Sequence, residues 1–60
     1  MVQLNSHLYY RRREQHEQRM ADRSIAPAIA EIHREMARRY ATLGEEALEQ
    51  EKTYRPRILL

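Results

Sequence analysis

Several residue types are scarce or missing in this chain of 60 residues, and each absence excludes a class of protein. The chain has no cysteine, no tryptophan and no phenylalanine, and it has one glycine and two prolines. Without cysteine there can be no disulfide scaffold, cysteine-based zinc site or thiol redox motif. With so little glycine, the chain is neither collagen-like nor a flexible linker.

Long apolar runs are missing as well. No stretch approaches the ~20 apolar residues of a membrane span, and the first residues do not form a basic region followed by an apolar one. We therefore expect no transmembrane helix, no secretion signal and no membrane partner. The expected location is the cytoplasm.

Charged residues are abundant and nearly balanced. They make up 33% of the chain, and 11 Lys and Arg against 9 Asp and Glu leave a formal net charge of +2. The few large apolar side chains cannot build a sizeable core, and small domains without disulfides or metals usually gain stability by associating. The composition predicts folding on a second copy or on a larger protein partner, with intrinsic disorder as the alternative.

A regular apolar stripe runs through the second half of the chain. Its members recur at steps of three or four residues, which is the spacing of one face of a straight α-helix. They are Ile25, Ile29, Ile32, Met36, Tyr40, Leu43 and Ala47. The stripe predicts a long helix over about residues 25–52.

Pro27 and Gly44 bear on where this helix begins and whether it is interrupted. Proline is tolerated only in the first turn of a helix, so the N-cap should lie between Ser24 and Ala26, with Ser24 the better capping residue. A capping-box spacing at Gly44 allows a new short helix to begin there. Ala47 stays in phase with the stripe, which favours one continuous helix.

The first half of the chain predicts a second helix over about residues 6–23. It contains neither glycine nor proline between positions 7 and 23 and is rich in arginine, glutamate and glutamine. Asn5 or Ser6 could cap it. Its sparse apolar side, which includes Tyr9 and Met20, is expected to be buried against the apolar stripe.

Together these patterns predict an all-α fold, an antiparallel two-helix hairpin with a C-terminal tail over residues 53–60. We expect two copies to associate as a homodimer in a four-helix bundle. The residues expected in the core and dimer interface are Tyr9, Met20, Ile25, Ile29, Ile32, Met36, Tyr40 and Leu43.

The candidates for chemistry are few. His7, His16 and His33 lack the spacing of a zinc site or of a di-iron bundle. The serine and threonine residues occupy cap or surface positions, and a chain of this size has no room for a substrate pocket. We therefore expect no enzyme activity, metal or cofactor.

One basic segment could contact a nucleic acid or an acidic partner. Clustered arginines beside aromatic rings suit phosphate contact and base stacking. The residues are Tyr10, Arg11, Arg12 and Arg13, directly after Tyr9. A nucleic-acid-binding dimer is therefore the alternative function, against the simpler interpretation of a charged helix surface.

The chain ends in three apolar residues, Ile58, Leu59 and Leu60, directly after Pro56 and Arg57. Pro56 ends any helix and favours an extended backbone before it. The tail could pack across the bundle, be recognised by a partner, or fray without a role.

Two short motifs carry a resemblance to known proteins. Tyr-Tyr-Arg-Arg-Arg at positions 9–13, followed by Ile-His-x-x-Met-Ala-x-x-Tyr at positions 32–40, resembles short bacterial proteins of unknown function that form helical hairpins. The resemblance spans about residues 8–43 and implies a fold without an activity. The function predicted is a small non-enzymatic interaction or regulatory module that acts through a helical surface or its apolar tail.

Overall fold

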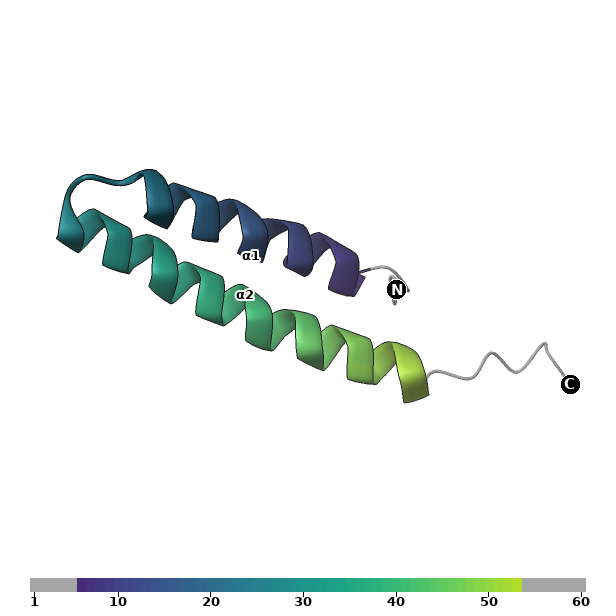
Figure 1. Cartoon of the computed structure of the whole chain (residues 1–60). Coiled ribbons are helices and arrows are strands. Elements are labelled where there is room, and N and C mark those ends of the chain that lie inside the picture. The colour runs from purple at the N-terminus through teal and green to yellow at the C-terminus, as the bar shows by residue number, and fades with distance from the viewer. Residues whose placement is uncertain (1–5, 54–60) are drawn as a thin grey trace, which may run out of the picture.

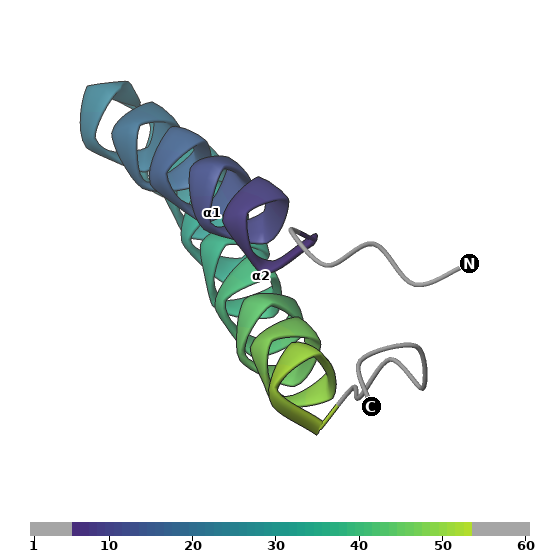
Figure 2. The ribbon, with the colours of Figure 1, turned by 90° about the vertical axis from the view of Figure 1, so that its right-hand side faces the viewer.

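The computed structural model describes residues 6–53, which form two helices joined by a short turn (Figure 1). Helix α1 covers Ser6–Arg23 and helix α2 covers Pro27–Thr53. The two helices lie side by side and antiparallel, and α2 extends beyond α1 at the open end of the hairpin (Figures 1 and 2). The predicted all-α helical hairpin is confirmed. Neither helix of this described part combines the length and the apolar character that crossing a membrane requires.

The turn between the helices places Pro27 at the first position of α2. The amide of Ala30 donates to the carbonyl of Ala26 over 3.0 Å, which makes Ala26 the N-cap. Proline fits the next position because its missing N–H would have no acceptor within the helix. The N-cap thus lies within the predicted range of Ser24 to Ala26, but the preference for Ser24 is wrong, since its hydroxyl donates to the carbonyl of Ala26 over 3.4 Å. The helix therefore begins two residues later than the expected start at position 25.

Helix α2 passes through Gly44 without a break, as the continuous alternative predicted. The backbone of Gly44 does not adopt a positive φ, so the conformation of the chain does not require glycine there. A Cβ atom at this position would lie 3.5 Å from the Cβ of Tyr10 and 3.8 Å from the carbonyl oxygen of His7. Gly44 therefore marks a close approach of α2 to α1.

Small side chains fill most of the contact between the helices. The buried apolar residues of the described chain are all alanines: Ala21 of α1 and Ala30, Ala37 and Ala47 of α2. Small residues at a helix contact let the two backbones approach closely. The expectation that Tyr9 and Met20 of α1 are buried against the apolar stripe is wrong for the single chain, because they remain 57% and 36% exposed, and Ile29 and Ile32 of the stripe are exposed as well.

Candidate interaction surface

The two helices meet along what we call the seam, a row of buried or half-buried residues that face the other helix. Glu17, Ala21, Ala30 and Ala37 are buried, and the other members are half-buried. The seam consists of Tyr10, Glu17 and Ala21 on α1 and of Ala30, His33, Ala37 and Gly44 on α2. These positions fix which side of each helix faces outward.

Most large apolar residues stand directly before a seam residue in the sequence. Such a residue lies about 100° round the helix from its neighbour, always in the same sense. Because the helices are antiparallel, the same sense of rotation brings the residues of both helices to one side of the hairpin. This side, which we call the apolar flank, carries Tyr9 and Met20 of α1 and Ile29, Ile32, Met36 and Leu43 of α2.

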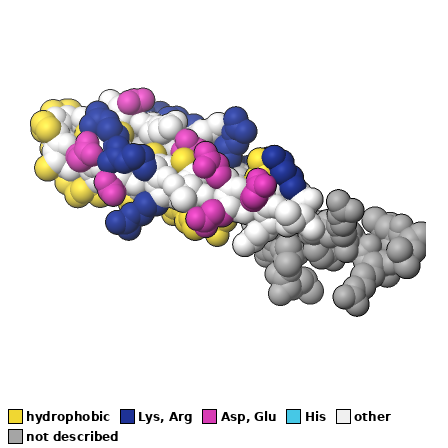
Figure 3. All heavy atoms as spheres, turned by 90° about the horizontal axis from the view of Figure 1, so that it is seen from below, with side chains coloured by type: hydrophobic (Ala, Val, Ile, Leu, Met, Phe, Trp, Pro, Cys, Tyr) yellow, Lys and Arg dark blue, Asp and Glu magenta, His cyan; other side chains and the backbone are white. Residues whose placement is uncertain are grey.

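The apolar flank is open to solvent over much of its area. Tyr9 is 57% exposed, and Met20, Ile29, Ile32 and Leu43 are also exposed. The sequence predicted that Ile25 begins both the second helix and its apolar stripe. This prediction is wrong, because Ile25 lies in the turn and is 99% exposed. In Figure 3, apolar side chains gather at the turn end and along one edge of the molecule. Most of the residues predicted for a dimer interface thus form a surface that the rest of residues 6–53 leaves exposed.

Tyr40 links this flank to the seam. Its ring lies 6.3 Å from that of Tyr10, centroid to centroid. The guanidinium carbon of Arg13 lies 5.5 Å from the centre of the Tyr40 ring, in a cation–π contact. Arg13 also forms an ion pair with Glu17 over 3.4 Å. The rings of Tyr9 and Tyr10 meet edge to face, with their centroids 5.4 Å apart. Tyr9 and Tyr40, both predicted as interface residues, therefore belong to one cluster of aromatic rings.

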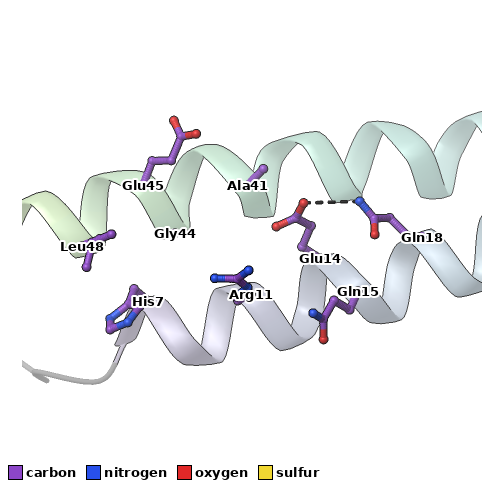
Figure 4. Close-up of a pocket in the computed structure, with 9 residues that line it drawn as sticks. All are labelled: His7, Arg11, Glu14, Gln15, Gln18, Ala41, Gly44, Glu45 and Leu48. Carbon is purple, nitrogen blue, oxygen red and sulfur yellow. Dashed lines mark hydrogen bonds between the residues drawn. The ribbon is translucent and has the colours of Figure 1, made fainter.

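The opposite side of the hairpin, which we call the polar flank, carries the residues that directly follow the seam. They are Arg11, Gln18 and Asp22 on α1 and Glu31, Arg34, Arg38 and Glu45 on α2. An open groove of about 390 Å³ runs between the helices there. Figure 4 shows Arg11 and Glu14 extending from α1 toward α2, with a hydrogen bond of 3.3 Å from Gln18 to Glu14. The two flanks therefore differ in polarity, although His16, which directly precedes the seam residue Glu17, also lies on the apolar flank.

A buried carboxylate lies in the seam. Glu17 is 3% exposed, and the Nδ1 atom of His33 lies 2.6 Å from its Oε1 atom. An ionised carboxylate has no hydrogen to donate, so the ring nitrogen of His33 must be the donor. The hydrogen bond from His33 lowers the pKa of Glu17, and the charges of His16 and Arg13 act in the same direction, against the effect of burial. The pair therefore joins the two helices through a hydrogen bond from His33 to the Glu17 carboxylate.

A second histidine–glutamate pair joins the helices at the open end. The backbone amide of His7 donates to Glu51 over 3.2 Å, and the Nδ1 atom of the same histidine lies 2.7 Å from the other carboxylate oxygen. Burial raises the pKa of Glu51, but the hydrogen bonds from the ring and the backbone of His7 outweigh it, and the net shift is downward. Both pairs connect α1 to α2 between residues far apart in the sequence.

The predicted basic segment does not form one surface. Arg11 lies on the polar flank and lines its groove, whereas Arg13 packs over Tyr40 at the seam. Arg12 is exposed and lies about 100° round the helix from each of them. Tyr10 is half-buried between the helices. The nucleic-acid alternative stays a prediction, with its contacts divided among several faces of α1.

The predicted tail site, Ile58, Leu59 and Leu60, lies outside the described residues. Residues 6–53 contain no group of three or more His, Cys, Asp or Glu side chains that could hold a metal ion. His7 and His33 instead bind carboxylates across the seam.

Sequence reasoning missed both histidine–glutamate pairs and the alanine seam. A repeated triplet in the sequence could have indicated the seam. It consists of a large apolar residue, an alanine and a charged residue, as in Met20-Ala21-Asp22 and Met36-Ala37-Arg38. The pairs have no such signal, because their members lie 16 and 44 residues apart. Comparison of the chain with protein-family models, with curated proteins and with solved structures found no match.

Proposed function

We propose that this chain is a small non-enzymatic interaction module of the cytoplasm that binds protein surfaces through its apolar flank. The first partner in this proposal is a second copy of the chain, and the product is a homodimeric four-helix bundle. A larger protein partner is the alternative occupant of the same flank.

The exposure of the apolar flank is the observation that supports this proposal. Large apolar side chains that lie together on one side of a small protein commonly mark an interaction site. Here they come from both helices and from the turn, whereas His7 and His33 are engaged with carboxylates between the helices. Glu17 and Glu51 bind His33 and His7, and these pairs hold the helices together.

The experiment is sedimentation equilibrium of the full chain over a wide concentration range. We expect the apparent mass to rise from 7.3 kDa to twice that value with increasing concentration. Ile32→Asp places a charge in the middle of the flank and should keep the protein monomeric. Circular dichroism on the same samples shows whether the helices persist in the monomer.

A matched control is Gln15→Asp, which adds the same charge at an exposed position of α1 outside the apolar flank. It should leave the association unchanged. A wild-type chain that stays at 7.3 kDa at every concentration would contradict self-association. Equal weakening by Gln15→Asp and Ile32→Asp would contradict the role of the apolar flank.

A further inference from the structure

Two arrangements could place the apolar flanks of two copies against each other, and they differ in the direction of the hairpins. In the first, the two-fold axis runs along the helices, so that both turns lie at the same end and α1 of each copy covers α2 of the other. In the second, the axis is perpendicular to the helices, the turns lie at opposite ends, and each helix lies on its own counterpart. Both are closed and isologous, so sequence periodicity does not distinguish them.

The two helices carry opposite net charge. Helix α1 contains five arginines against three acidic residues, a net charge of +2. Helix α2 contains four basic residues against six glutamates, a net charge of −2. The hairpin therefore consists of one basic and one acidic helix, and both border the apolar flank.

This charge difference favours the arrangement with both turns at one end. There, α1 of each copy lies between the two acidic helices, and no two adjacent helices carry the same sign. With the turns at opposite ends, α1 lies on α1 and α2 lies on α2, so that like charges meet along both edges of the interface. Like charges across an interface disfavour a pairing, whereas complementary ones select it.

The distribution of apolar side chains favours the same arrangement. Met20, Ile25 and Ile29 lie in the half of the hairpin next to the turn, and Ile25 is 99% exposed there. The open half of the apolar flank offers fewer exposed large apolar residues, chiefly Tyr9 and Leu43, because the exposed Leu8 and Leu48 do not belong to the flank. When both turns lie at one end, the isoleucine-rich halves cover each other. When they lie at opposite ends, each such half faces the sparser one.

The area available fits a dimer. The exposed parts of the flank side chains and of Ile25 come to on the order of 600 Å² per copy, if a whole large side chain offers about 200 Å². Stable protein interfaces bury about 800 Å² per partner, including a polar rim. The charged edges of α1 and α2 surround the flank and supply such a rim.

We propose that the apolar flank binds a second copy of this chain with both turns at the same end of the bundle, so that α1 of each copy packs on α2 of the other. This inference rests on the proposed homodimer and adds its orientation. In the bundle, basic and acidic helices alternate round the axis. The turn ends, with Ile25 of both copies, meet at one end.

Distances between spin labels test the orientation. The chain has no cysteine, so Ala26→Cys at the turn and Lys52→Cys at the open end each provide one label per copy. With both turns at one end, the two labels of a dimer lie at the same height. Each variant should then give a distance of about 10–30 Å, because the two α2 helices lie diagonally across a bundle whose neighbouring axes are about 8–10 Å apart, and each label adds its own arm.

The opposite arrangement gives a different result in any register. Positions 26 and 52 are about 39 Å apart along α2 at 1.5 Å per residue. When the turns lie at opposite ends, the two label distances along the axis add up to about twice that length, so at least one of them reaches about 40 Å. Pulsed electron–electron double resonance on the full labelled chain distinguishes the two arrangements.

The outcomes distinguish the orientation from the dimer itself. Two short distances support the proposal. A dimer in which either distance reaches about 40 Å overturns the orientation and leaves the homodimer standing. Labels with no intermolecular coupling, in a protein that sediments as a monomer, overturn both. Adding Ile32→Asp to either labelled variant should remove the coupling, and coupling that persists would overturn the apolar flank as the interface.

Discussion

At the scale of single residues, the seam depends on groups that are costly to bury alone. Glu17 is almost fully enclosed, and its hydrogen bond with His33 provides the compensation that a buried carboxylate needs. The nearby Nε atom of Arg13 is buried without a hydrogen-bond partner among the described residues. The hydrogen bond between Glu17 and His33 is therefore the main polar connection in the middle of a seam otherwise made of Tyr10, alanines and Gly44.

Removing both members of this pair should cost less than the sum of the two single removals. Glu17→Ala leaves the ring N–H of His33 without its acceptor, and His33→Ala leaves the carboxylate without its donor. Each single change should lower the free energy of unfolding by about 1–3 kcal/mol. The double variant should lose less than the sum, because two alanines match the rest of the seam.

Urea denaturation at one fixed protein concentration measures this double-mutant cycle. Glu45→Ala, which removes an exposed glutamate of the polar flank, is the control and should change the free energy of unfolding by less than about 0.5 kcal/mol. Additive losses from the two single changes would show that the pair does not couple the helices.

The same carboxylates predict how stability depends on pH. The pKa values of Glu17 and Glu51 are lower in the folded chain than their ordinary value. A lowered pKa stabilises the fold fully above the unfolded-state pKa, which is about 4.3 for glutamate, and this stabilisation is lost as the pH falls through the lowered value. We therefore expect the free energy of unfolding to fall steeply below about pH 4.3.

Denaturation curves from pH 6 to pH 2.5 check this expectation. Glu17→Gln should flatten the acid limb, because the amide does not titrate, while Glu45→Gln should leave most of it in place. An acid limb of equal slope in the wild type and in Glu17→Gln would refute the assignment of the effect to the seam.

At the scale of the elements, the small residues of α2 control how closely α1 can approach. Gly44 lies opposite Tyr10 at a distance that still leaves ordinary contact for a methyl group. Its φ angle is one that any residue adopts. Glycine at this position therefore lowers helix stability without serving the backbone geometry.

Gly44→Ala should stabilise the hairpin by about 0.5–1 kcal/mol, since alanine loses less conformational entropy in a helix than glycine. Gly44→Leu should have the opposite effect, because its side chain would push α1 away and cost about 1–3 kcal/mol. Thermal unfolding followed by circular dichroism at 222 nm compares the two. A decrease of stability in Gly44→Ala would mean that the helices lie closer at this point than the structure shows.

At the scale of the whole molecule, the hairpin has an alanine seam inside and its largest apolar residues outside. This distribution links folding to association, because the apolar flank is buried only when a partner covers it. Stability should then depend on protein concentration.

We expect the midpoint of thermal unfolding to rise on the order of 10 °C over a hundredfold increase in concentration, as for a folded dimer of this size. Ile32→Asp should remove this dependence and Gln15→Asp should keep it. A wild-type midpoint that is independent of concentration would contradict coupled folding and association.

The sequence by itself determined the two helices, their connection and the existence of an apolar stripe. Helix periodicity, the proline at position 27 and the lack of other breakers are local properties, and local backbone preferences decide them. Continuity through Gly44 was also predictable, because residues on both sides stay in phase.

Only the tertiary structure decided which face of α2 meets α1. The stripe suggested that the largest apolar residues lie between the helices, but two backbones approach more closely over alanine and glycine, which places the seam about a quarter turn away. The pairing of Glu17 with His33 and of His7 with Glu51 depends on that rotation and on the antiparallel register. Such contacts join residues far apart in the chain, and no local pattern in the sequence encodes them.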